Sequence, residues 1–205
     1  MNQDSKPEGK QSFIAAARRE QIIEAAVQTL DDIGYVNASL AKIAKRAGIS
    51  TALISYHFSD KNDLMNHLII KLVERYTSYI LERVNQRHTS EEKLEAYIAS
   101  SLAYQVTHPA HQNALIEIFF NARTPEQVPY YKLGAEEDEL MSTLRDILRE
   151  GQQQGVFGTF HISVMANVVQ GSIAEYMLSP STKSVDLETY SSELISIVQQ
   201  ATKKQ

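Results

Sequence analysis

Apolar residues recur at spacings of three and four along almost the whole chain, and no segment shows the strict alternation of a half-buried strand. Such spacing places apolar side chains on one face of an α-helix. Glycine and proline are also sparse, with eight and five residues in 205. The sequence therefore predicts an all-α protein of about nine helices.

Capping residues and glycines divide this pattern into segments. Ser39 and Ser50 are suited to cap helix N-termini, and Gly34 and Gly48 are placed just beyond helix ends. The expected helices cover about 13–33, 40–47, 51–57, 61–88, 90–108, 109–121, 130–154, 161–178 and 185–203.

The composition is that of a globular protein, with 43% hydrophobic and 22% charged residues. No apolar run approaches the roughly 18 residues that a membrane helix needs, and the polar start MNQDSKPEGKQS does not resemble a secretory signal. We therefore expect a cytoplasmic protein with no membrane segment.

Charge is distributed unevenly along the chain. Residues 1–66 contain eight Lys and Arg against eight Asp and Glu, so the whole net charge of −5 lies in the remainder. Within residues 40–61 the cations Lys42, Lys45, Arg46 and Lys61 outnumber the one carboxylate, Asp60. An acidic body with a local basic surface is compatible with binding to nucleic acid.

The basic region surrounds the string ISTALISYHFSDK, residues 49–61. Two short helices joined across residues 47–50, after a longer helix that can brace them, form a helix-turn-helix arrangement. The second helix of such a motif lies in the major groove of DNA. Small and hydroxyl-bearing residues near its start suit contact with base edges and phosphates. The candidate DNA contacts are Ser39, Lys42, Ser50, Thr51, Ala52, Ser55, Tyr56, His57 and Lys61.

Each candidate taken singly also has a structural explanation. The hydroxyls can be helix caps, Tyr56 and His57 can be packing residues, and Lys61 can be a solvated lysine. Their joint arrangement beside a basic helix favours DNA binding.

The longer string SLAKIAKRAGISTALISYHFSDKNDL, residues 39–64, closely resembles the DNA-binding segment of TetR-family transcriptional regulators. The resemblance includes the GIS start, the Tyr-His-Phe end and the lysine after a short linker, and it extends from about Arg18 to Leu64. Within the family it is most similar to the choline-responsive betaine-pathway repressor. Beyond Leu64 only helix count and order are similar, so the effector is unknown and choline is not predicted.

The resemblance implies a homodimer that binds a palindromic operator and is released by a small molecule. It implies a DNA-binding domain at 13–60 and an effector-binding and dimerisation domain at 61–205. Thr51, Ala52 and Ser55 then correspond to base-reading positions. The positions that correspond to phosphate contacts are Ser39, Tyr56, His57 and Lys61. A hydroxyl residue is common in the family where this chain has Leu53, so any contact there is expected to be apolar.

The C-terminal helices carry weaker signals. The segment 161–178 is apolar on more than one side, which indicates that it packs on its own core and on something further. The resemblance implies that this further contact is the second subunit of a dimer. The alternative is a larger monomer core. The candidate interface residues are Val169, Ile173, Tyr176, Leu194 and Ile197, and the candidate effector-pocket residues are Tyr104, Glu117, Phe120 and Glu175. For Glu117 an outer polar stripe with Asn113 and Asn121 is the better alternative.

Two other classes of protein fit less well. An all-helical dimetal enzyme would carry Glu-x-x-His pairs, and no histidine here has a glutamate three residues before it. The chain contains neither a nucleophile elbow nor a phosphate-binding loop. An architectural DNA-binding protein would be basic overall. We therefore expect no catalytic activity, no cofactor and no metal.

Overall fold

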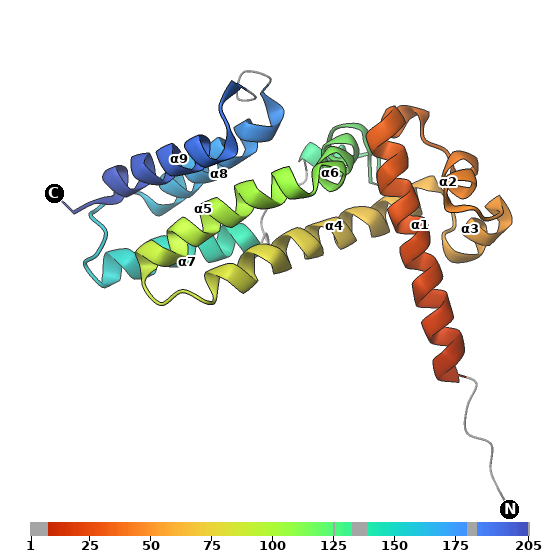
Figure 1. Ribbon diagram of the computed structural model, residues 1–205, viewed down its shortest axis with the longest axis horizontal. Helices are drawn as coiled ribbons and strands as arrows, with labels where there is room; N and C mark the ends of the chain where they lie inside the picture. Colours follow the sequence, from red (N-terminus) through yellow and green to blue (C-terminus); the bar gives the residue numbers. More distant parts are fainter. Residues whose placement is uncertain (1–7, 125, 133–138, 180–183, 205) are drawn as a thin grey trace, which may run out of the picture. The chain divides into compact units, whose positions relative to one another are not determined.

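The computed structural model describes residues 8–124, 126–132, 139–179 and 184–204. These ranges contain nine α-helices and one 3-10 turn, which confirms the all-α prediction (Figure 1). The elements are α1 Glu8–Asn37, α2 Leu40–Ala47, α3 Thr51–His57, α4 Lys61–Val84, α5 Ser90–Thr107, α6 Pro109–Asn121, η1 Tyr130–Lys132, α7 Glu139–Gln153, α8 Ile162–Leu178 and α9 Leu187–Thr202.

The chain forms two compact units. The first comprises residues 1–72 and 110–134, and the second comprises residues 73–109 and 135–205. Helix α4 contributes its first half to one unit and its second half to the other. The functional boundary expected between residues 60 and 61 stays a prediction. The compact units divide the chain differently, because α6 packs with the N-terminal helices.

The core of the first unit explains how two very short helices are stable. Helices of seven or eight residues are marginal alone and depend on tertiary packing. Here each helix buries apolar side chains in one cluster shared with α1, α4 and α6. The main members are Ile22, Ala26 and Leu30 of α1, Ile43 of α2, Ile54 of α3 with its C-cap residue Phe58, Leu64 and Leu68 of α4, and Ala114 and Ile118 of α6.

The local stop signals predicted most boundaries here correctly. Gly48 adopts a left-handed conformation with φ of 67°, and α2 ends before it. Gly34 also has a positive φ, of 71°, but with an extended ψ of 168°; helical turns resume after this kink and α1 runs on to Asn37. The first helix is therefore longer than predicted at both ends.

Two other predicted boundaries were wrong. Helix α4 ends at Val84, four residues before the expected end at His88. The single helix expected over 130–154 is instead the 3-10 turn η1 followed by α7, and residues 133–138 lie outside the described ranges.

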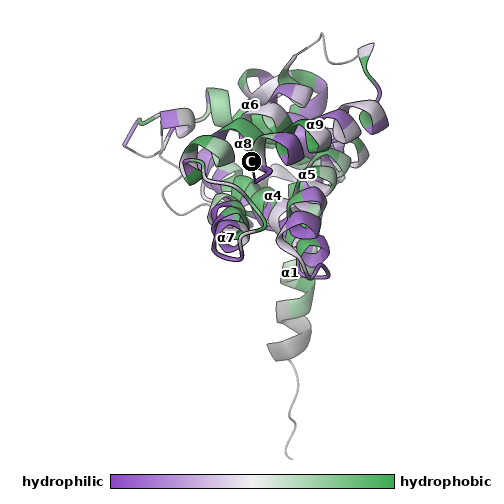
Figure 2. Cartoon of the chain, turned by 90° about the vertical axis from the view of Figure 1, so that its left-hand side faces the viewer, coloured by the Kyte–Doolittle hydropathy of each residue, from purple (hydrophilic) through white to green (hydrophobic). Residues whose placement is uncertain are grey.

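The second unit is built from α5, α7, α8 and α9 around an apolar core, with the end of α4. Figure 2 shows hydrophilic and hydrophobic residues mixed along the helices. Helix α8 buries Ala166, Val169 and Ile173, whereas Val164 and Val168 are exposed. No helix among the described residues is long and apolar enough to cross a membrane.

Candidate nucleic-acid interface

Helix α3 presents a polar face because the apolar residues on its other side are buried in the core. Ile54 is 0% exposed and Phe58, the residue that caps the helix, is 1% exposed. This packing turns Thr51, Ala52 and Ser55 outward. Three of the predicted contacts are thus brought together on one exposed surface.

The two serine candidates have structural roles as well. Ser39 Oγ accepts a hydrogen bond from the Lys42 backbone N–H at 3.3 Å, and Ser50 Oγ accepts one from the Leu53 N–H at 3.2 Å. These are N-cap bonds, which begin α2 and α3. The helix starts that define the motif therefore depend on the same hydroxyls.

Polar side chains of α1 hold the far ends of both short helices. Gln21 Nε2 donates to the carbonyl of Ala47 at 2.7 Å, and Arg19 Nη2 donates to the carbonyl of His57 at 3.2 Å. The Arg19 guanidinium also lies 5.5 Å from the centre of the Phe58 ring. These bonds satisfy carbonyls that a helix C-terminus leaves unpaired. Sequence reasoning missed them, since the bonded residues are 26 and 38 positions apart.

The cations of α2 lie on its exposed side. Lys42 Nζ donates to the Asn37 carbonyl at 2.9 Å, and Arg46 forms an ion pair with Asp32. Both side chains, like that of Lys45, are exposed. The basic character expected around the motif is therefore on the surface.

Lys61 is held more tightly than a solvated lysine. Its Nζ donates to the Tyr35 carbonyl at 2.5 Å and lies 4.1 Å from the centre of the Tyr35 ring. Burial lowers the pKa of the Lys61 ammonium. The side chain joins the end of α1 to the start of α4, and its phosphate contact stays a prediction.

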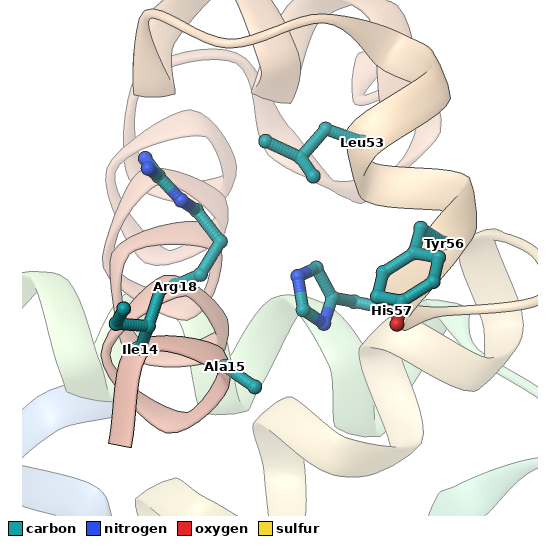
Figure 3. Close-up of a pocket in the computed structure, with 6 residues that line it drawn as sticks. All are labelled: Ile14, Ala15, Arg18, Leu53, Tyr56 and His57. Carbon is teal, nitrogen blue, oxygen red and sulfur yellow. The ribbon is translucent and has the colours of Figure 1, made fainter. Parts of the chain in front are cut away.

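His57 and Tyr56 close the exposed surface of α3 on the side that faces α1. Tyr56 is 80% exposed, and its ring meets the His57 ring edge-on at 5.1 Å. Burial, followed by the positive charges of Arg19 and Arg18, lowers the pKa of His57. Figure 3 shows the His57 ring pointing from α3 towards α1.

The four effector-pocket candidates are not assembled within either unit. Glu117 and Phe120 belong to the first unit, and Tyr104 and Glu175 to the second. Tyr104 is buried against His108, with stacked rings 4.2 Å apart, whereas Phe120 and Glu175 are exposed.

Glu117 has a specific partner within the first unit. Its Oε2 accepts a hydrogen bond from the Tyr35 backbone N–H at 2.7 Å, directly after the kink at Gly34. On the same helix, Asn113 donates to Asp31 at 2.6 Å. The outer polar stripe of α6 is thus a contact with the end of α1.

The predicted dimer residues need correction. Val169, Ile173 and Leu194 are buried in the core of their own unit, so they do not face outward. Tyr176 packs against Tyr190 with ring centres 4.7 Å apart, and only Ile197 is well exposed, at 59%. The outward apolar side chains of α8 are instead Val164, Val168 and Leu178.

Comparisons with known proteins agree with this arrangement. The family model described as "Bacterial regulatory proteins, tetR family" matches residues 22–68, which span the second half of α1, then α2, α3 and the start of α4. The HTH-type transcriptional regulator BetI of Escherichia coli K12 is 28% identical over 149 residues, covering 69% of this chain and 75% of BetI.

Solved structures match over nearly the whole length. The fatty acid degradation regulator FadR from Bacillus halodurans has a TM-score of 0.72 at 22% identity, covering 89% of this chain and 94% of FadR. The TetR-family regulator PfmR from Thermus thermophilus has a TM-score of 0.71 at 18% identity, covering 91% of this chain and 96% of PfmR. Taken with the exposed face of α3 and the caps of α2 and α3, the family-model match over residues 22–68 and the similarity to BetI support a TetR-family transcriptional regulator.

Proposed function

We propose that the chain binds a palindromic operator as a homodimer through α2 and α3, and that a small molecule bound in the second unit releases it. The observation that carries the proposal is the orientation of α3. Its apolar side is buried by Ile54 and Phe58, so Thr51, Ala52 and Ser55 project outward beside the basic side of α2.

The proposed contacts follow from side-chain size and chemistry. Thr51 and Ala52 are small enough to approach a base edge or a thymine methyl group, and Ser55 can exchange hydrogen bonds with a base. Lys42 and Tyr56 are exposed and can reach phosphates. If the effector releases the protein from its operator, the bound protein acts as a repressor.

A homodimer supplies the two recognition helices that a palindrome requires, with half-sites about 34–36 Å apart or a multiple of that spacing. The proposed interface is the outward side of α8, with Val164, Val168 and Leu178, together with Ile197 of α9. Exposed apolar side chains of this kind on two helices are suited to burial at a subunit interface.

The second unit also offers the groups that an effector would use. Tyr76 and Tyr79 meet the buried Tyr104 ring edge-on, at 5.2 and 5.1 Å. Beside Tyr104, the buried Oε1 of Gln105 accepts no hydrogen bond from any described residue. A buried acceptor of this kind requires a donor, so we propose that the effector carries one. Similar solved structures include a fatty acid degradation regulator and a ketosteroid regulator, so the fold alone does not select a ligand class.

Selection from a random duplex pool tests the proposal. The purified protein should enrich an inverted repeat, and Ser55→Ala should change the preferred base at one position in each half-site. Ser142→Ala, at an exposed serine of α7, is the matched control and should leave the enriched sequence unchanged. An architectural protein would enrich no sequence, and that result would contradict the proposal.

A further inference from the structure

A groove between α1 and α3 lies beside the recognition surface, and its α1 wall lies outside the two helices of the helix-turn-helix motif. Its volume is about 440 Å³. Residues spaced along one side of each helix form its two walls, which Figure 3 shows. The lining residues are Ile14, Ala15 and Arg18 of α1 and Leu53, Tyr56 and His57 of α3.

The lining combines cationic and apolar groups. The guanidinium of Arg18 is permanently charged and carries five N–H groups. One of them donates to Gln21 Oε1 at 2.5 Å. His57 adds an imidazole and Tyr56 a phenol. Ile14, 53% exposed, provides apolar surface. Such a lining suits a ligand that has an anionic group and an apolar edge.

A sugar–phosphate unit of DNA has both properties, since the phosphate is anionic and the deoxyribose presents carbon atoms. The groove also continues the surface proposed to read DNA, because Tyr56 and His57 belong to α3. A duplex seated on Ser55 and its neighbours would bring a strand alongside this groove.

We propose that the groove seats a sugar–phosphate unit of the operator, which makes α1 a third DNA-contacting element. Arg18 and His57 contact the phosphate. Ile14 and Leu53 contact the sugar. This inference rests on the proposed DNA binding by α3.

Replacement of Arg18 tests the phosphate contact. Affinity for the selected operator and for an unrelated duplex is measured across a series of salt concentrations. Arg18→Gln should weaken both by a similar factor, about tenfold, and should reduce the slope of log K against log salt by about one. Arg18→Lys keeps the charge and should restore most of the slope. Arg149→Gln, an exposed arginine of α7, removes the same charge outside the groove and should change neither quantity appreciably.

A matched pair of glutamate substitutions tests the position of the groove. Phe13 is exposed on the same helix but does not line the groove, whereas Ile14 does. Both Ile14→Glu and Phe13→Glu add one negative charge to α1. Ile14→Glu should cost about tenfold more operator affinity, because like charges in direct contact are strongly unfavourable. Thermal unfolding of each variant verifies the fold.

The outcomes separate this inference from the proposed function. If Arg18→Gln behaves like Arg149→Gln, and the two glutamate variants are equal, the groove is not a DNA contact. The proposed function still stands if Ser55→Ala then alters base preference. If neither Ser55→Ala nor Thr51→Ala alters base preference, the proposed function fails and this inference fails with it.

Discussion

The outward faces of α3 and α8 differ in the groups that they expose. Helix α3 buries Ile54 completely and turns small polar residues such as Thr51 and Ser55 outward. Helix α8 buries Val169 and Ile173 yet still exposes Val164 and Val168. A surface for DNA requires hydrogen-bonding groups and little apolar area, whereas a surface for another subunit gains energy from apolar burial.

The largest effect is expected from a charge placed on the outward face of α8. Val168→Glu should convert the dimer to a monomer in analytical ultracentrifugation, because a carboxylate would be buried without a partner. Operator affinity should fall by about 100-fold or more, since linked half-site binding is lost. The matched control is Val106→Glu on α5, because Val106 is 45% exposed and Val168 is 50% exposed. A dimeric Val168→Glu variant would exclude this face as the interface.

Alanine substitutions at two glycines, one in each unit, should change stability in opposite directions. Gly34 has φ of 71°, and an added Cβ would lie 3.1 Å from Glu117 Oε2. Gly34→Ala should therefore lower the free energy of unfolding by about 2 kcal/mol. Gly171 lies within α8, and apart from the adjoining backbone of that helix no atom of the described residues would lie within 4 Å of an added Cβ. Gly171→Ala should raise the stability of the protomer by about 0.5–1 kcal/mol. Urea denaturation measures both, and equal effects would contradict the assigned backbone strain.

Two carboxylates that looked alike in the sequence should also behave differently. Glu117 accepts the Tyr35 backbone N–H, so Glu117→Ala should cost about 1 kcal/mol of stability by removing that bond. Glu117→Gln keeps an acceptor and should cost less. Glu175 is exposed on α8, and Glu175→Ala should change stability by less than about 0.5 kcal/mol. Similar losses for both alanine variants would argue against a specific role for Glu117.

The sequence predicted features that depend on neighbouring residues. Caps at Ser39 and Ser50 and the stop at Gly48 act over one helical turn, so α2 and α3 were located correctly. The partner of Glu117 lies 82 positions away, and no local pattern indicates it. Helix α8 is apolar on two sides, and periodicity alone could not tell which side, that of Val169 or that of Val168, packs on its own core.

The smallest expected effect is the pH dependence that His57 gives to operator affinity and to folding stability. Burial and the charges of Arg19 and Arg18 lower the pKa of His57 from 6.5 in the unbound protein. A phosphate beside the ring would raise that pKa, so the complex would bind more protons than the free protein. Operator affinity should therefore increase by about threefold as pH falls from about 8 to about 6, and His57→Gln should flatten this dependence.

Folding stability should change in the opposite direction. Because the unfolded chain binds the proton more readily than the folded one, His57 makes the fold less stable as pH falls below 6.5. Measuring unfolding and operator binding over the same pH series distinguishes the two effects. If acid weakens both in parallel, and His57→Gln removes both changes, His57 affects binding only through the stability of α3.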